Sequence, residues 1–213
     1  MNSDSPRSIG LSDLAQLTLR ANVVFAVRCA QRIRPCFELA GDAPRRDEQL
    51  VAVDGAITAA VAFCQDLEPR PGQAAIAAAS ASVVADETCT FTRFAGYAAV
   101  RAAEAAGYAE AYVSNPSEAA IVDVVAAAFG AGRVLAANAD GFTLGLVVAA
   151  LISDFDNLQR LAPGTSQDLG PPIDPSETGP LGSLWPLGRP GWIGEIDAAR
   201  PTIFTNFTAS ACR

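Results

Sequence analysis

Apolar residues recur at steps of three and four along the first 162 residues, which is the spacing of amphipathic α-helices. The segment 11–39 places one apolar stripe on a single face and further apolar side chains on the others, so we expect it to form a central helix. A second helix is predicted over 47–67, where heptad-like spacing forms a continuous seam. Its seam residues are Leu50, Val53, Ile57, Ala60, Cys64 and Leu67.

Three further helical segments follow. The segment 73–113 is rich in alanine and fits either one long helix or two helices divided near residues 88–92, where threonines lower the helix propensity. The sequence Asn-Pro-Ser-Glu at 115–118 is typical of a helix start, with an asparagine cap and a proline at the first helical position. A last helix is predicted over 142–162, and Pro163 ends it.

The composition changes after residue 162. Proline and glycine become frequent, in runs that a helix cannot accommodate, while both tryptophans of the chain also lie here. Only 202–208 has the alternation of a strand. We therefore expect an all-α fold: an antiparallel bundle of five or six helices over 11–162, a flexible N-terminus over 1–10, and a Pro/Gly-rich, mostly irregular C-terminal extension over 163–213.

Alanine supplies an unusually large part of the apolar content. Half of the residues are hydrophobic but only 7% are aromatic, because much of the apolar content is alanine. Alanine favours helices and fills little space. The sequence therefore predicts helices that approach one another closely.

All fifteen positive side chains are arginine, and the chain has neither lysine nor histidine. This usage is typical of a high-GC bacterial genome. It excludes an imidazole base or metal ligand, a Schiff-base lysine and a phosphate-loop lysine. We expect no catalytic residues, no cofactor and no metal.

The net charge of −8 argues against binding to nucleic acid or to an anionic membrane, because no basic run could displace many counterions. The longest apolar run, 141–152, is too short to span a bilayer, and the first residues lack the pattern of a signal peptide. We expect a cytoplasmic protein. The five cysteines lack paired spacing and are expected to be buried, reduced thiols.

The extension supplies the first candidate binding site. Proline restricts the backbone around its two tryptophans, so these side chains could anchor a protein partner at a low entropic cost. The same residues could instead lie in grooves of the chain's own bundle, which would avoid exposing two tryptophans. The candidate docking residues are Trp185, Leu187, Arg189 and Trp192.

The second candidate is an arginine stripe on the predicted central helix, formed by Arg20, Arg28 and Arg32. Guanidinium groups bind anions with fixed, bidentate geometry, so this stripe could clamp an anion or a carboxylate. The alternative is a buried ion pair with an acid of the second helix, such as Asp47 or Asp54.

Other carboxylates give a weaker pattern. Asp154 and Asp156 point about 200° apart on a helix, so they cannot share a metal, and we expect them on solvated faces together with Glu104 and Glu110. The preferred function is a non-enzymatic, cytosolic helical interaction module, such as an adaptor, scaffold or accessory subunit, whose partner is another protein or a second copy of the chain. The alternative is a helical binder of a small molecule or anion, or an enzyme, with an arginine–carboxylate pocket between helices that includes Arg28, Arg32 and Asp54.

Overall fold

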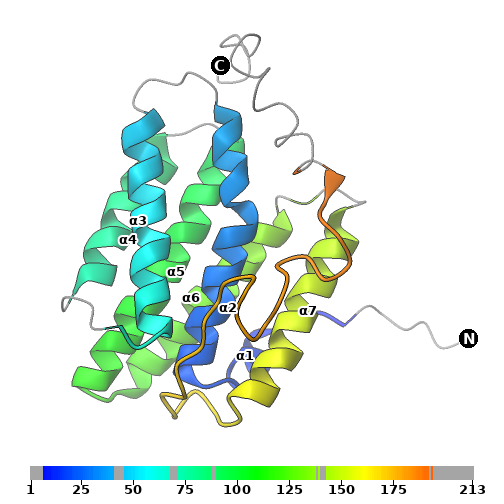
Figure 1. The fold of residues 1–213 in the computed structure, drawn as a ribbon. Helices are drawn as coiled ribbons and strands as arrows, with labels where there is room; N and C mark the ends of the chain where they lie inside the picture. The colour runs from blue at the N-terminus through cyan, green and yellow to red at the C-terminus, as the bar shows by residue number, and fades with distance from the viewer. Residues whose placement is uncertain are drawn as a thin grey trace, which may run out of the picture.

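The structure is a computed structural model that describes residues 7–40, 46–67, 72–87, 90–137, 139, 143–191 and 193. Within these ranges it is all-helical, with seven α-helices, one 3-10 helix and no strand. Successive long helices run in opposite directions (Figure 1), which confirms the predicted all-α antiparallel bundle. The helices are α1 (Leu11–Leu14), α2 (Leu19–Ile33), the 3-10 helix η1 (Arg34–Ala40), α3 (Arg46–Cys64), α4 (Gln73–Glu87), α5 (Thr90–Ser114), α6 (Glu118–Ala137) and α7 (Thr143–Leu161).

Helix α2 is the central element of the bundle. Fourteen of its fifteen residues are buried, including three arginines. Its close neighbours are α3, α5, α6 and α7. The apolar side chains on every face of this segment explain its position, because a helix that is apolar all round is stable only when other elements surround it.

The predicted helix over 11–39 is wrong in its extent, because three shorter elements occupy the segment. Thr18 is the N-cap of α2, and its side chain accepts a hydrogen bond from the Ala21 backbone. The buried Asn22 side chain donates to the carbonyls of Leu14, Leu17 and Thr18, which fixes the bend between α1 and α2. After Ile33 the chain tightens into η1, whose second residue, a proline, cannot donate an α-helical hydrogen bond.

The alternative left open for 73–113 is resolved in favour of two helices, α4 and α5. The start of α6 also differs from the prediction. Ser117 accepts a hydrogen bond from the Ala120 backbone at 3.2 Å, and the helix begins at Glu118. Ser117 is therefore the N-cap, two residues later than the predicted Asn115, and serine caps helices as well as asparagine does.

Alanine and glycine allow α4 and α5 to lie very close together. A Cβ atom at Gly96 would lie 3.0 Å from the Cα of Ala85, so only glycine fits this crossing without a shift of the helices. The close approach that the alanine content predicted is therefore present at this pair.

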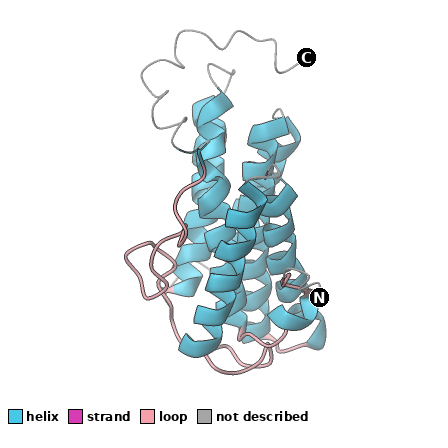
Figure 2. Cartoon of the chain, turned by 90° about the vertical axis from the view of Figure 1, so that its right-hand side faces the viewer, coloured by secondary structure: helices cyan, strands magenta, loops and turns pink. Residues whose placement is uncertain are grey.

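The extension lies against the bundle between α2 and α7 (Figure 1) and forms a long loop along the outside of the helices (Figure 2). Its backbone caps α2, because Asp168 and Leu169 accept hydrogen bonds from the first two amides of that helix at 2.8 and 2.9 Å. Four of its large apolar side chains are buried: Ile173, Leu181, Trp185 and Ile193. The strand-like stretch 202–208 lies outside the described residues.

Candidate functional site

Two arginines and one aspartate form a charged cluster inside the protein. Arg28 and Arg32 lie one turn apart on α2 and are fully buried, and Asp154 on α7 is 1% exposed. Asp154 Oδ1 lies 2.9 Å from Arg28 Nε, and Oδ2 lies 2.6 Å from Arg32 Nη1. One carboxylate therefore joins the central helix to α7 through two guanidinium groups.

The same guanidinium groups bind the backbone of the extension. Arg28 donates to the carbonyls of Pro175 and Gly182 at 3.1 Å and to that of Ser183 at 2.8 Å. Arg32 Nε donates to the carbonyl of Leu184 at 2.7 Å, and its guanidinium carbon lies 5.8 Å from the ring centre of Trp185. The cluster has two positive charges and one negative charge, and these carbonyl oxygens supply part of the compensation that burial requires; Arg32 Nη2 has no hydrogen-bond partner among the described residues.

The position of Asp154 corrects the prediction that its side chain is solvated. The two side chains do point to opposite sides of α7, as predicted, since Asp156 is on the outer side and pairs with Arg7 at 3.0 Å. The error was to place Asp154 outside as well, although the two aspartates point apart. A carboxylate can face inward here because two guanidinium groups neutralise it.

Asp54 does not join the cluster. Its two oxygens bind Arg34 Nε and Nη2 at 2.9 and 2.8 Å, in a half-exposed bidentate pair between α3 and η1. The side chains that α3 buries carry no charge, and apart from Gln49 they are apolar or small, among them Val53 and Ile57. The expected partner of Arg28 from the second helix is therefore replaced by one from α7.

The thiols near these groups are unsuited to nucleophilic chemistry. Burial raises the pKa of Cys29 to about 12, although the positive charge of Arg32 acts in the opposite direction. Burial also raises the pKa of Cys64. Cys36 is a buried thiol as well, so these three cysteines confirm the prediction of buried, reduced thiols. Cys89 and Cys212 lie outside the described residues.

The candidate docking residues of the extension do not share one surface. Trp185 is 5% exposed and packs into the core, whereas Leu187 is 69% exposed. Arg189 is exposed and lies 3.5 Å from Glu177. Trp192 lies outside the described residues. In this arrangement Trp185 belongs to the fold of its own chain and is not available as an anchor for a partner.

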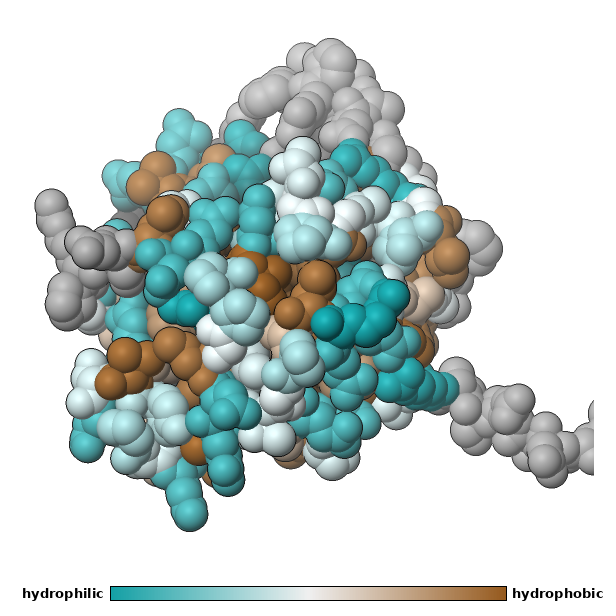
Figure 3. All heavy atoms as spheres, turned by 60° about the horizontal axis from the view of Figure 1, so that its bottom comes forward, coloured by the Kyte–Doolittle hydropathy of each residue, from teal (hydrophilic) through white to brown (hydrophobic). Residues whose placement is uncertain are grey.

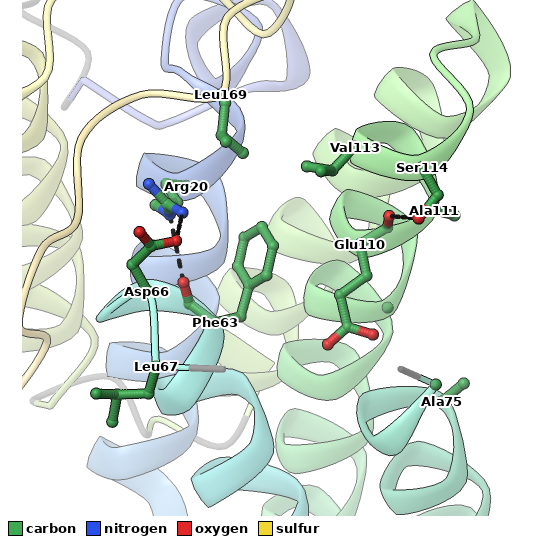
Figure 4. A pocket seen from close by; sticks show the side chains of 12 residues that line it. Arg20, Phe63, Asp66, Leu67, Ala75, Glu110, Ala111, Val113, Ser114 and Leu169 are labelled. Carbon is green, nitrogen blue, oxygen red and sulfur yellow. Dashed lines mark hydrogen bonds and ion pairs between the residues drawn. The ribbon is translucent and has the colours of Figure 1, made fainter. Parts of the chain in front are cut away.

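A cavity of about 450 Å³ lies at the end of the bundle where α2 begins and α5 ends (Figure 4). The surface at this end of the molecule carries small apolar groups among polar side chains (Figure 3). The cavity is lined mainly by apolar and small residues, and three of its described lining residues are charged. The lining residues are Arg20, Phe63, Asp66, Leu67, Gly72, Ala75, Gly107, Glu110, Ala111, Val113, Ser114 and Leu169.

Arg20 forms one wall of this cavity and has all of its nitrogens engaged. Its Nε donates to the Phe63 carbonyl at 3.3 Å and Nη1 to the Gly170 carbonyl at 3.0 Å, while Nη2 pairs with Asp66. Asp66 follows α3 in a left-handed conformation, with φ 57°, which an aspartate tolerates better than most residues. Arg20 therefore holds the end of α3 and the extension against the start of α2.

Glu110 projects from α5 into the space opposite Arg20 (Figure 4). Burial raises the pKa of this carboxyl, and a hydrogen bond from the Gly72 backbone partly offsets that effect. Its Oε1 atom is closed off from water and has no hydrogen-bond partner among the described residues. An enclosed carboxylate oxygen without a donor is costly, and no described residue compensates for it.

Sequence reasoning did not select Glu110, which was expected on a solvated face. The helical positions around it are small, with Ala106 and Ala109 buried and Gly107 and Ala111 lining the cavity. One pattern could have indicated this cavity: a single carboxylate among residues that are too small to fill the space beside it.

Glu110→Gln is expected to raise the free energy of unfolding at pH 7 and to leave it unchanged at about pH 4. The native pKa is raised, so the native state gains stability as the pH falls through that value and loses it as the carboxyl ionises. The other charged groups of the cavity are Arg20 on α2 and Asp66 after α3, and they neutralise each other. Urea denaturation at both pH values measures the effect.

Glu104→Gln is the matched control on the same helix. Glu104 pairs with Arg101 at 2.7 Å near the surface, so removing its charge is expected to lower stability slightly or leave it unchanged at pH 7. A Glu110→Gln variant that is less stable than the parent at pH 7 would show that the carboxylate is well compensated in the native state.

Among the described residues, no three or more cysteine, aspartate or glutamate side chains are grouped so that they could hold a metal ion. Within the same part of the chain, α6 is long and apolar enough to cross a membrane, but 44% of its most apolar window is buried in the bundle, as in the core helix of many soluble proteins. No family model, curated protein or solved structure matches this chain, so its own geometry is the basis for assigning a function.

Proposed function

We propose that this protein is a non-catalytic binding protein for a small amphipathic molecule, which occupies the cavity between α2, α3, α4 and α5. One observation carries the proposal: a mainly apolar cavity of about 450 Å³ whose wall includes a carboxylate oxygen, Glu110 Oε1, that has no hydrogen-bond partner among the described residues. Ligand pockets have this character, because apolar walls provide affinity and a few polar groups fix the orientation of the ligand.

We assign a structural role to the buried charges of Arg28, Arg32 and Asp154, which lie away from the cavity. These groups bind each other and the extension, and the cluster lies outside the lining of the cavity. Of the predicted arginine stripe, only Arg20 borders the cavity, where it is already paired. The proposed function is therefore close to the alternative predicted from the sequence, a helical binder of a small molecule, but its carboxylate is Glu110 and not Asp54.

Binding of the neutral dye Nile red tests the proposal. The full chain is expected to bind the dye saturably, with a rise in its fluorescence. Ala75→Trp places an indole in the cavity from α4 and is expected to weaken dye binding at least about tenfold, or about 1.4 kcal/mol.

Ala79→Trp is the matched control, because Ala79 lies one turn further along α4, is exposed and does not line the cavity. This variant is expected to bind Nile red like the parent. Equal dye binding by both variants, or no saturable binding by the parent, would contradict the proposal.

The interaction module expected from the sequence remains a prediction. The outer face of α4 is where such a partner would find apolar surface, because Ile76 and Val83 are 70% and 54% exposed.

A further inference from the structure

We infer that the cavity selects an organic cation: a protonated amine with a compact apolar body, whose N–H donates to the carboxylate of Glu110. This inference rests on the proposed binding function and specifies the chemical class of its ligand. It follows from the charge balance of the cavity, from the missing donor at Glu110 and from the character of the opposite walls.

The described lining of the cavity is negatively charged. The three charged lining residues are Arg20, Asp66 and Glu110, so the described lining has a net charge of −1 at neutral pH. The ion pair of Arg20 with Asp66 uses one guanidinium nitrogen, and backbone carbonyls use the other two. Arg20 keeps further N–H donors, but Asp66 already balances its charge, whereas no cationic side chain in the described lining balances the charge of Glu110.

The missing hydrogen bond points to the same class of ligand. Glu110 receives a hydrogen bond from the Gly72 backbone, while its Oε1 has none and is shielded from water. The terminal torsion of glutamate is broad, so a small rotation brings either oxygen toward the cavity. An alcohol can donate to this carboxylate, but only a cation both donates and neutralises its charge.

The remaining walls define the body of the ligand. Phe63 and Leu67 line the α3 side, Val113 lines the end of α5, and Leu169 closes the side of the extension. These surfaces favour a hydrocarbon group that leaves water as it enters. A strongly hydrated polyamine would lose solvation along the same walls without finding a second unpaired carboxylate in the described lining.

Three matched probes test the inference on the full chain at pH 7: phenethylamine, phenethyl alcohol and hydrocinnamate. They share the same apolar body and differ in charge. Isothermal titration calorimetry is expected to show the amine binding about tenfold more tightly than the alcohol, a difference of about 1.4 kcal/mol, with the acid weakest. Glu110→Gln is expected to remove the preference for the amine and to leave the affinity for the alcohol unchanged.

Two controls separate the site from general attraction to an acidic protein. Glu104→Gln removes one negative charge from the same helix outside the cavity and is expected to keep the preference for the amine. Ala75→Trp is expected to weaken all three probes. Amine binding that survives both Ala75→Trp and Glu110→Gln would overturn the inference, because the amine would then bind elsewhere.

The remaining outcomes distinguish the inference from the proposed function. If the alcohol or the acid binds as tightly as the amine, and Ala75→Trp weakens them all, the cavity is a ligand site but the assigned class is wrong. If neither Nile red nor any of the three probes binds in the cavity, the proposed function fails and the inference fails with it.

Discussion

Replacing Asp154 by asparagine is expected to lower the free energy of unfolding by about 3–5 kcal/mol. The substitution keeps the size of the side chain and removes the single negative charge that Arg28 and Arg32 share at 2.9 and 2.6 Å. Two guanidinium groups would then remain in the core with only carbonyl oxygens as partners. Because neither arginine has exposed surface, water cannot replace the lost charge without opening the bundle. Urea denaturation followed by circular dichroism measures the change.

Asp156→Asn is the matched control, two residues away on α7. Its partner Arg7 is half exposed, so the pair is expected to contribute less than about 1 kcal/mol. If Asp154→Asn is as mild as this control, the core charges are compensated by something other than the carboxylate, and the cluster does not hold α7 to α2.

A chain that ends at Ala162 is expected to lose its cooperative unfolding transition at 25 °C. The truncation removes four buried apolar side chains, each worth roughly 1.5–3 kcal/mol, and the total is comparable to the roughly 5–15 kcal/mol that stabilises a typical domain. It also removes the carbonyls that accept hydrogen bonds from Arg28 and Arg32 and those that cap α2. Circular dichroism during urea and thermal denaturation provides the readout.

A chain that ends at Ile193 provides the comparison, since it keeps all four buried side chains and all of these acceptors. It is expected to retain a cooperative transition. A stable, cooperative chain ending at Ala162 would show that the bundle folds without the extension, and would favour the alternative in which residues such as Leu187 dock to a partner.

The regular part of the fold could be predicted from the sequence because it depends on local patterns. The bounds of α7 followed from spacing, and the seam residues Val53 and Ile57 of α3 are buried as expected, whereas Leu67 lies beyond the end of α3 at Cys64 and is 56% exposed. The break between α1 and α2 could not be predicted in this way. It depends on side chain to backbone hydrogen bonds of Asn22 and on a cap at Thr18 within an otherwise helical apolar pattern.

The candidate site shows where sequence reasoning fails. The arginine stripe pointed correctly to buried charge, but the partner of Arg28 lies 126 residues away, and nothing in the local pattern of α7 distinguishes Asp154 from a solvated aspartate. Glu110 was missed for a related reason. Its importance comes from the space that small residues of α5 and of the start of α4 leave between these helices, α2 and α3. Spacing along one helix does not reveal the space between helices.

The hydrogen bonds between α2 and the extension also affect the order in which the protein folds. Arg28 and its acceptors in the extension are separated by 147–155 positions along the chain, so these hydrogen bonds raise the contact order of the protein. During synthesis α2 leaves the ribosome well before residues 175–184. The two guanidinium groups therefore stay hydrated until this segment has been made, and its docking onto α2 is a late step of folding.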